Sequence, residues 1–441
     1  METATVQKET LWRNPNFLKL WTSETISQFG SQFTGLALPL TAIIILNADS
    51  TELGVLVFAG SVPWLLFGLL VGVWVDRHRK KRIMVTSNVL RGSLLALIPI
   101  AAVLGVITNL GILFLYAVSF SVGFLQVFFD ITYQSYLPSL VRRDQLVEGN
   151  RNLQASASTA QVAGPTIAGI VIGIITAPIA IAVDACSFFA SALALGRIDH
   201  EEVIEEKILK PSVLADIREG LHVVFSDKRL RMIAGCTGTS NFFSTAFGAI
   251  FLLYLVLPSP AGLGVSRSVV GVTAGIIFSV ASVGALVGVA ISSRVAKRIG
   301  VGPAIIGSMV IAGVGSIPYY LAGSLTASPL FTLAGFSVNW SMLSIMAGQF
   351  IIFIGVVVYN VNQVSLRQAI VPLRLQGRMN ATMRFLVWGT IPLGGLAGGL
   401  LGTFLGLRTA IGISVLGVLL AFLWVLLSPV RSLKKIPEPL E

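Results

Sequence analysis

Five ionisable side chains interrupt long apolar stretches of this chain: Glu24, Arg91, Asp130, Asp184 and Arg384. Placing a charged group in an apolar environment costs several kcal/mol, so such groups usually pair with a polar partner or serve a function. A carboxyl group in this setting can exchange a proton or hold a cationic ligand. The three acids are therefore where ionisable chemistry is expected, with an ion pair or a hydrogen bond inside the fold as the alternative.

The apolar stretches around these residues are long enough to cross a membrane. Of the 441 residues, 54% are hydrophobic and only 12% are charged, whereas a soluble domain has about 25% charged residues. A run of roughly 20 apolar residues crosses a hydrocarbon core of about 30 Å. We predict an all-α membrane protein with twelve spans, at residues 17–46, 53–75, 83–106, 111–135, 153–175, 178–196, 232–257, 268–292, 302–323, 343–365, 381–405 and 407–428. Short alternating strands are not evident in the sequence, which argues against an outer-membrane barrel.

Basic residues are concentrated in every second connection between the runs. The outer loops of the predicted topology contain only Arg267 and Arg408, and the other connections and the tail contain many more. The positive-inside rule then places both termini in the cytoplasm, and we predict a multi-pass protein of the cell membrane, meaning the inner or plasma membrane of a bacterium. The first run, after the polar residues 1–15, is expected to be a retained span rather than a cleaved signal.

The formal charge of +11 does not indicate nucleic-acid binding here, because no soluble segment is long enough to form a binding module. The two cysteines, Cys186 and Cys236, lie in or beside apolar runs and suggest neither a disulfide framework nor a metal site. We therefore predict no nucleic-acid partner, no metal and no cofactor.

The longest polar stretch, residues 199–231, divides the chain into two halves. Its second part, residues 212–225, has apolar residues at helical spacing and predicts an amphipathic helix at the membrane surface. The halves repeat each other weakly, with an offset of 230 residues relating Val141 to Val371. We predict two pseudo-symmetric six-helix bundles, at residues 1–196 and 232–428, with a linker at 197–231 and a cytoplasmic tail at 429–441.

A glycine and an acid precede a cluster of basic residues between the second and third runs. The stretch is Gly72-x-x-x-Asp76-Arg77-x-Arg79-Lys80-Lys81, and a weaker copy, Gly288-x-x-x-Ser292, follows the eighth run. This stretch resembles the signature loop between helices two and three of the major facilitator superfamily, whose fold has two six-helix halves. The family usually has glycine where this chain has Arg79, and Ser292 replaces the acid in the second copy.

Further short motifs resemble one branch of that superfamily, the bacterial exporters that include enterobactin exporters and macrolide-efflux proteins. They are Ser27-Gln28-Phe29-Gly30, Gly164-Pro165-Thr-Ile-Ala-Gly169, Asp184-Ala-Cys-Ser187-Phe188, Arg218-Glu219-Gly220-Leu221 and Pro392-Leu393-Gly394-Gly395. The resemblance covers the whole chain but does not identify a substrate.

The signature stretch is expected to act as a conformational latch. Gly72 would permit close helix approach, and Asp76 would face the positive end of a helix dipole, which the resemblance locates at the start of span eleven. The basic residues of this turn, Arg77, Arg79 and Lys80, would pair with Asp130 at the end of span four. The alternative is that the basic cluster only fixes the topology.

The motif in span five, Gly164, Pro165 and Gly169, resembles the helix-five glycine-proline motif of drug–proton antiporters. A proline inside a span frees a backbone carbonyl and can bend the helix. Glycines beside it let another helix approach closely. We expect this helix to take part in gating; the alternative is that the motif serves only tight helix packing.

In the resembled fold, helices one, four, seven and ten line a central cavity and helices three, six, nine and twelve lie outside. This implies that Glu24 lies on a cavity helix, which makes it the leading candidate for proton exchange or for a cationic substrate. Asp184 would lie on a peripheral helix and is expected to make a packing hydrogen bond. The predicted cavity residues are mostly aromatic or amide-bearing: Gln28, Asn241, Phe242, Phe243, Tyr254, Gln349, Tyr359, Asn360, Asn362, Gln363 and Trp388.

The resulting prediction is a monomeric secondary transporter that works by alternating access. It would export a bulky amphipathic small molecule and be driven by proton entry. The alternatives are an uptake symporter of the same fold and a membrane receptor that does not transport. An enzyme is not expected, because the sequence has no evident nucleophile–base constellation and no phosphate-binding loop of the form G-x-x-x-x-G-K-S/T.

Overall fold

The computed structural model describes residues 11–75, 78–142, 145–200, 202, 213–325, 330–333 and 336–435. Within these ranges the first half begins with a 3-10 turn, Leu11–Arg13. Its helices are α1 (Pro15–Ile45), α2 (Ser50–Val75), α3 (Lys80–Val103), α4 (Ile107–Leu140), α5 (Leu146–Ile175) and α6 (Ala177–Gly196).

The linker contains α7 (Val213–Ser226), as its helical spacing predicts. The second half contains α8 (Lys228–Val256), α9 (Val270–Ile299), α10 (Val301–Ala322), α11 (Trp340–Ile370), α12 (Leu373–Trp388), α13 (Thr390–Leu405), α14 (Leu407–Leu420) and α15 (Leu423–Leu426). The eleventh span is divided at Gly389 into α12 and α13. Pro392 explains the break, because it has no N–H to donate to the carbonyl of Trp388.

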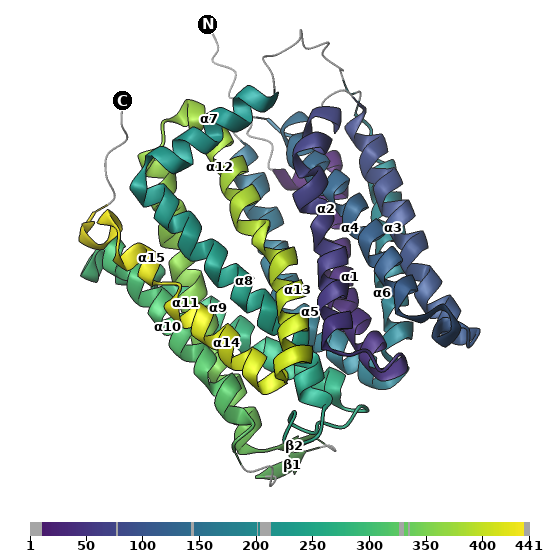
Figure 1. Cartoon of the computed structure of the whole chain (residues 1–441). Helices are drawn as coiled ribbons and strands as arrows, with labels where there is room; N and C mark the ends of the chain where they lie inside the picture. Colours follow the sequence, from purple (N-terminus) through teal and green to yellow (C-terminus); the bar gives the residue numbers. More distant parts are fainter. Residues whose placement is uncertain are drawn as a thin grey trace, which may run out of the picture.

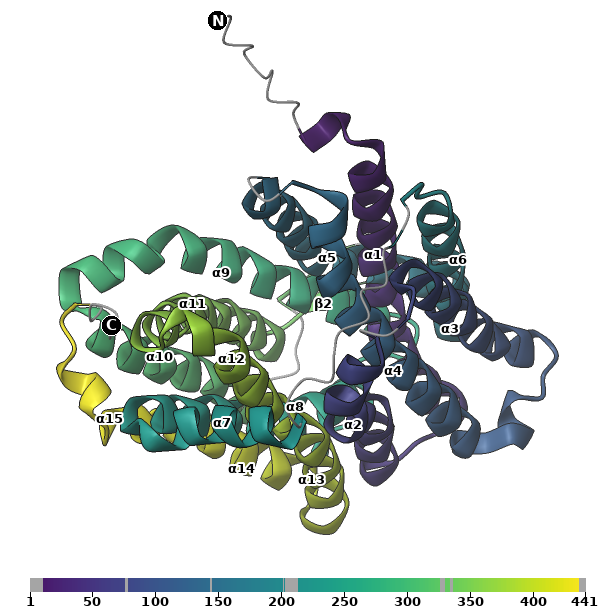
Figure 2. The same cartoon turned by 90° about the horizontal axis from the view of Figure 1, so that it is seen from above.

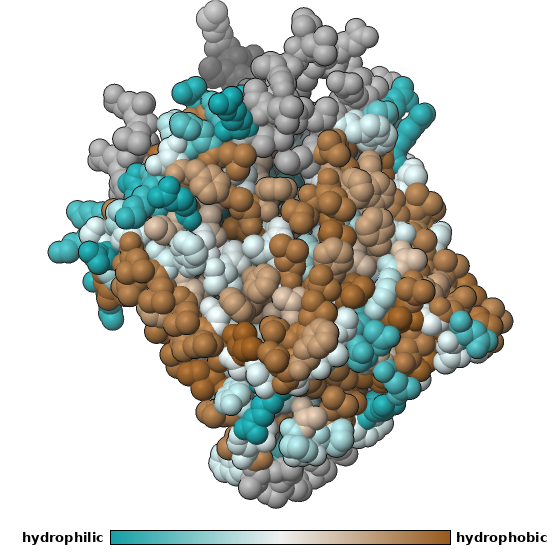
Figure 3. All heavy atoms as spheres, viewed as in Figure 1, coloured by the Kyte–Doolittle hydropathy of each residue, from teal (hydrophilic) through white to brown (hydrophobic). Residues whose placement is uncertain are grey.

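Within the described ranges, twelve helical segments are long and apolar enough to cross a membrane. The prediction of an all-α protein with twelve spans is confirmed, and the chain is a multi-pass membrane protein. Several helices are longer than the predicted spans; α4, for example, ends at Leu140 rather than at residue 135. An apolar run marks only the part of a helix inside the hydrocarbon, and the helix continues beyond it. Figure 3 shows hydrophobic side chains over most of the visible face and hydrophilic ones mainly toward its ends.

The helices pack into two groups that meet along two helix pairs. In the first group α1 packs on α5 and α6, α3 on α4 and α6, and α2 on α4; in the second, α11 packs on α9 and α10, and α8 on α13 and α14. The groups meet where α2 contacts α13 and where α5 contacts α9. Figures 1 and 2 show the two groups side by side.

The first and the last described residues, Leu11 and Lys435, lie at the same end of the molecule as α7 (Figure 1). We call this end the terminal end. The opposite end carries a two-stranded antiparallel hairpin of β1 (Phe331–Leu333) and β2 (Phe336–Val338), and we call it the hairpin end (Figure 1). The hairpin lies in the loop of residues 323–342, which the sequence singles out only for its length. Apart from it, the described secondary structure is helical.

The hydrophobic core shows that the two halves are joined at the hairpin end. One continuous cluster contains buried residues of both halves, such as Leu40, Leu53, Leu253 and Ile277. Toward the terminal end the core separates into clusters that belong to one half only, around Phe17 in the first half and around Tyr359 in the second. The protein is therefore closed between its halves at the hairpin end.

A carboxylate at the start of the linker binds the beginning of α3. Glu202 accepts hydrogen bonds from the backbone N–H groups of Lys80 (2.5 Å) and Lys81 (2.7 Å), the first two residues of α3. Arg79 precedes this helix and provides no side-chain cap. Glu202 therefore supplies the cap that the local sequence lacks, and a carboxylate also suits the helix dipole there. At the other end of the linker, Glu219 forms an ion pair with Arg378 on α12.

We expect Glu202→Ala to loosen the first turn of α3 and to lower stability by about 1 kcal/mol, which is typical of a lost N-terminal cap. Amide hydrogen exchange should rise at residues 80–83. Glu219→Ala is the matched control, because its partner lies on α12 and it should leave exchange in α3 unchanged. Equal protection of residues 80–83 in Glu202→Ala and the wild type would contradict this role.

Candidate functional site

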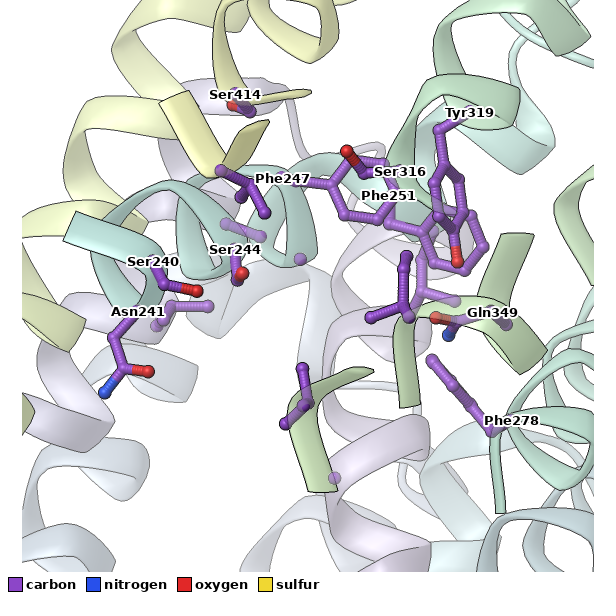
Figure 4. A pocket seen from close by; sticks show the side chains of 18 of the residues that line it. Ser240, Asn241, Ser244, Phe247, Phe251, Phe278, Ser316, Tyr319, Gln349 and Ser414 are labelled. Atoms are coloured by element: carbon purple, nitrogen blue, oxygen red, sulfur yellow. The ribbon is translucent and has the colours of Figure 1, made fainter. Parts of the chain in front are cut away.

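A cavity of about 640 Å³ lies between the two halves. Its walls come from α1, α2 and α4 on one side and from α8, α9, α10, α11 and α14 on the other. Figure 4 shows the aromatic rings of Phe247, Phe251 and Tyr319 grouped on one side of it. A space of this size is typical of a small-molecule site.

The polar groups of the cavity are hydroxyls and amides. On α8 they are Thr237, Ser240, Asn241 and Ser244. Ser240, Ser244 and Gly248 are four residues apart and form one small-residue face. Gln349 on α11 adds an amide near Tyr319 (Figure 4). Among the described residues that line the cavity, none is an Asp, Glu, Lys, Arg or His. The cavity is therefore suited to a ligand with a large apolar surface and a few hydrogen-bonding groups.

The structure brings four of the residues proposed from sequence to this cavity: Asn241, Gln349, Tyr359 and Asn360. Tyr359 and Thr237 join α11 to α8 through a hydrogen bond of 2.7 Å between their hydroxyls. Asn241 donates to the carbonyl of Val387 at 3.2 Å, so its amide also ties α8 to α12.

The remaining proposed cavity residues lie elsewhere in this conformation: Gln28, Phe242, Phe243, Tyr254, Asn362, Gln363 and Trp388. The Phe243 ring packs on Gly417 of α14, and the backbone of Phe242 lies against Gly394. The Tyr254 hydroxyl donates to the Tyr319 carbonyl at 3.4 Å, inside the core. The Trp388 and Trp64 rings meet edge to face, with centroids 5.5 Å apart.

Gln28, Asn362 and Gln363 make hydrogen bonds within or between helices instead. Gln28 donates to the Glu24 carboxylate, Asn362 donates to the Ser292 hydroxyl at 3.3 Å, and Gln363 donates to Asn360 at 3.4 Å. Ser292 occupies the acidic position of the second signature copy, and it is fully enclosed at 1% exposure. Its partner on α11 satisfies it without a charge.

The expectation that spans nine and twelve lie outside the cavity needs correction. Ser316 and Tyr319 of α10 and Ser414 of α14 are among the lining residues. The reason lies in the small side chains of α8, where Ser240, Ser244 and Gly248 leave the helices behind them uncovered. In the sequence, the small residues of α8 are the one feature that could have indicated that α10 and α14 reach the cavity.

Glu24 lies apart from the cavity, inside the first half. Its side chain is 7% exposed, and one carboxylate oxygen accepts a hydrogen bond from Gln28 at 2.7 Å. The other oxygen is buried and has no hydrogen-bond partner among the residues that the structure describes. The charged groups of neighbouring helices that act on it are Arg91 of α3 and Asp130 of α4.

Arg91 is the centre of a buried polar cluster next to Glu24. Its side chain is 1% exposed, and its guanidinium lies 4.6 Å from the ring centre of Phe129 and 4.2 Å from that of Phe188. It donates hydrogen bonds to Gln126 and Asn88. These contacts hold the cation by rings and amides rather than by a direct ion pair.

The cluster continues from Arg91 in two directions. Gln126 donates to Asp130 at 2.7 Å, and Asn88 donates to Ser191, which shares a 2.6 Å hydrogen bond with Ser23 on α1. Four helices, α1, α3, α4 and α6, thus contribute to one connected network. Asp184 accepts a hydrogen bond at 3.2 Å from Ser187, which lies one turn later on the same helix, α6.

The signature turn is partly visible. Asp76 and Arg77 lie outside the described residues. A side chain added at Gly72 would meet no atom within 4 Å, so the close helix approach predicted there is not made in this conformation.

Of the basic residues predicted to pair with Asp130, the two that the structure describes, Arg79 and Lys80, do not do so in this conformation. Lys80 donates to the Ser135 carbonyl at 3.0 Å, and the hydrogen-bond partner of Asp130 in the described chain is Gln126. Asp130 lies five residues deeper than Ser135, about 7.5 Å along the helix, which explains why Lys80 stops short of it.

The motif of span five lies at the contact between the halves. The carbonyl of Gly271 on α9 would be 2.4 Å from a side-chain carbon added at Gly169, and the Pro165 carbonyl would be 2.8 Å from one added at Gly275. Gly164 faces α1 instead, against Gln32. Two hydrogen bonds support the α5–α9 contact, from Ser282 to the Gln161 carbonyl at 3.2 Å and between Thr166 and Ser279.

We expect Ser244→Trp to fill the cavity and to reduce movement of a bulky ligand at least tenfold, because an indole replaces a hydroxymethyl group in the open space. The folded protein should remain, since Ser244 is exposed to the cavity. Ser93→Trp is the control, because Ser93 is exposed on α3 away from the cavity. Unchanged transport by Ser244→Trp, at equal expression and thermal stability, would contradict the assignment of this space.

Comparisons with known proteins agree with this architecture. A family model described as Major Facilitator Superfamily matches residues 20–386. The multidrug efflux pump Tap of Mycolicibacterium fortuitum is 26% identical over 230 residues, which is 50% of this chain and 55% of that protein. Macrolide efflux protein A of Streptococcus pyogenes is 23% identical over 221 residues, 48% of this chain and 52% of that protein. The chain spans about half the length of the curated relatives it matches.

Solved structures match almost the whole chain. A bacterial homologue of the iron transporter ferroportin, in its inward-facing state, has a TM-score of 0.69 at 16% identity and covers 95% of this chain and 99% of its own. The nucleoside transporter NupG has a TM-score of 0.69 at 14% identity, covering 93% of this chain and 98% of its own. At such identities the likeness concerns the fold alone.

Proposed function

Because the chain belongs to the Major Facilitator Superfamily, whose fold is that of transporters, we propose that it exports a bulky amphipathic small molecule by alternating access. The observation that carries this proposal is the cavity between the halves, which has aromatic, hydroxyl and amide walls and no carboxylate or basic group among its described lining residues. Two similar proteins are named as efflux pumps for multiple drugs and for macrolides. Their names suggest the substrate class, and the cavity chemistry favours it.

The direction of movement follows from the topology that we propose. The basic residues gather at the terminal end, so the positive-inside rule locates this end in the cytoplasm of a cell membrane. The closed hairpin end is then the outer side, and the conformation described here is inward-facing. We propose that residues 1–196 and 232–428 are the two bodies that rock, as a monomer, with the linker at 197–231 and the tail at 429–441 on the cytoplasmic side.

We propose that Glu24 couples transport to protons. Among the described residues, one oxygen of its buried carboxyl group has no hydrogen-bond partner, and a proton can be carried there. Its other oxygen is bonded to Gln28, and the charges of Arg91 and Asp130, which belong to the neighbouring hydrogen-bond network, act on it. The cavity and the carboxyl group are separate, so substrate and proton would be exchanged at different places in the same cycle. Arg91 and Asp130 are the charged groups through which a change at Glu24 would reach neighbouring helices.

The signature turn would act in the opposite half of the cycle. In this proposal Gly72, Asp76, Arg77, Arg79, Lys80 and Asp130 form the latch when the cytoplasmic side closes. In this conformation Gly72 makes no close helix contact of the predicted kind, and Lys80 donates to the Ser135 carbonyl rather than to Asp130, which is consistent with a released latch. The motif of Gly164, Pro165 and Gly169 would act at the outer gate.

The test is efflux from intact cells that lack their own pumps, using macrolides, other drugs and siderophores in turn. We expect lower accumulation when the protein is expressed, and loss of this difference when a protonophore removes the proton gradient. Accumulation that rises with an inward proton gradient would establish the uptake symporter instead. Ligand binding to membrane vesicles without any movement would establish a receptor.

A further inference from the structure

A second hollow lies on the outside of the first half, between α2, α3 and α4 near the terminal end. Its volume is about 490 Å³. Three basic residues of the turn and the start of α3 form one side of it, His78, Arg79 and Arg82. The other side is aromatic. We call this hollow the basic groove.

The aromatic side of the basic groove is a continuous row of rings. The Trp74 ring stacks on His78 with centroids 3.9 Å apart and meets Phe128 edge-on at 5.4 Å. Phe128 in turn contacts Phe124 at 5.0 Å. Trp74 is 44% exposed, and an exposed tryptophan beside basic residues is typical of the boundary between lipid tails and headgroups.

The basic side is available to a ligand. Arg79 and Arg82 are exposed, and among the described residues neither has an ion-pair or hydrogen-bond partner. The nearby acid, Glu202, is bound to the backbone N–H groups of Lys80 and Lys81. Glu202 therefore pairs with neither arginine, and the backbone N–H groups of Lys80 and Lys81 are already occupied.

The apolar surface that leads away from the arginines runs along the membrane-facing side. Leu66, Leu70 and Trp74 are four residues apart on α2, so they share one helix face, and all three are exposed. On α3, Val89 and Leu90 are exposed beyond Arg82 in the same direction along the helix. A ligand with an anionic head at Arg79 and Arg82 would thus have apolar surface beneath it for acyl chains.

We propose that the basic groove binds an anionic diacyl phospholipid. Its phosphodiester accepts hydrogen bonds from Arg79 and Arg82, since guanidinium groups match phosphate oxygens in geometry and charge. Its acyl chains lie on Trp74 and Phe124 and along Leu66 and Leu70 of α2. Basic pockets between membrane helices on the cytoplasmic side are suited to such headgroups.

The experiment counts phosphatidylglycerol bound to the purified, detergent-solubilised full chain by native mass spectrometry. Phosphatidylcholine with the same acyl chains is the comparison lipid. We expect Arg79→Gln combined with Arg82→Gln to weaken phosphatidylglycerol binding roughly twenty-five-fold, because each basic residue contributes about a factor of five. Trp74→Ala with Phe124→Ala keeps both charges, and it should remove the advantage of long-chain over short-chain phosphatidylglycerol.

Arg294→Gln combined with Arg298→Gln is the matched control. Both residues are exposed near the end of α9, in the corresponding turn of the second half, and the change in net charge is the same. Loss of binding in this control to the same extent would overturn the proposal in favour of diffuse attraction. Unchanged binding in the first pair would overturn it directly. Competition by inorganic phosphate at equal concentration would also overturn it, since a free-anion site would then explain the result.

Discussion

Glu24→Gln is expected to remove the dependence of efflux on the proton gradient and to lower gradient-driven efflux at least tenfold. Glutamine has nearly the same shape as glutamate and can still accept the hydrogen bond from Gln28, which is 2.7 Å long in the wild type. It cannot gain or lose a proton. The fold and the cavity should therefore be kept while the exchange step is lost. The measurement is efflux from energised cells with and without a protonophore.

Two further variants separate proton exchange from packing. Asp184→Asn removes another buried acid of the same half, which is 1% exposed and bonded to Ser187. It should retain gradient-driven efflux if its role is packing. Glu24→Asp keeps the carboxyl group and should retain part of the activity. Full gradient-dependent transport by Glu24→Gln would contradict the role in proton exchange that we propose for Glu24.

The division of the chain into membrane helices could be predicted because hydropathy reports the part of each helix that lies in hydrocarbon. The same signal could not give the helix ends, as the extension of α4 to Leu140 illustrates. The cap from Glu202 to α3 could not be predicted either, because 121 residues separate it from Lys81. Contacts of this kind depend on the arrangement of helices, which hydropathy does not contain.

The cavity was only partly predictable for a geometric reason. Phe242 and Phe243 are taken up by contacts with other helices: the backbone of Phe242 lies against Gly394 of α13, and the Phe243 ring packs on Gly417 of α14. The residues of α8 that line the cavity include Ser240, Ser244, Phe247 and Phe251, which recur at intervals of three or four. This spacing was present in the sequence, but small residues are weaker signals than aromatic ones.

The charged residues of the polar cluster could be predicted from the sequence, but the contacts that connect them could not. Glu24, Arg91 and Asp130 stand out in the sequence as ionisable groups within spans. That Arg91 would be held between Phe129 and Phe188 depends on the packing of α3 against α4 and α6. The described part of the basic turn does not reach Asp130 in this conformation, because Lys80 bonds to the Ser135 carbonyl, about 7.5 Å along the helix from Asp130.

Gly169→Val is expected to shift the protein away from the conformation that is closed at the hairpin end. The first added carbon would already lie 2.4 Å from the Gly271 carbonyl oxygen, and backbone on both sides of the contact leaves little room for adjustment. Overpacking of this kind costs about 1–3 kcal/mol, which changes the ratio of the two conformations by roughly five- to 150-fold. Because α5 and α9 also share the hydrogen bond from Ser282 to the Gln161 carbonyl, their separation should release that bond too.

The shift can be measured as a distance between spin labels at Asn109 and Ser268, which are exposed on different halves toward the hairpin end. With both native cysteines replaced by serine, Gly169→Val should populate longer distances than the unmodified glycine. Gly307→Val is the control, because a side-chain carbon added at Gly307 meets no atom within 4 Å and the distances should stay as they are. If Gly169→Val gives the same distances as this control, then α5 and α9 do not form the outer gate, and the closure there must depend on α2 and α13. The close approach of Gly54 and Gly399 would be the next contact to widen, since its atoms are backbone on both sides as well.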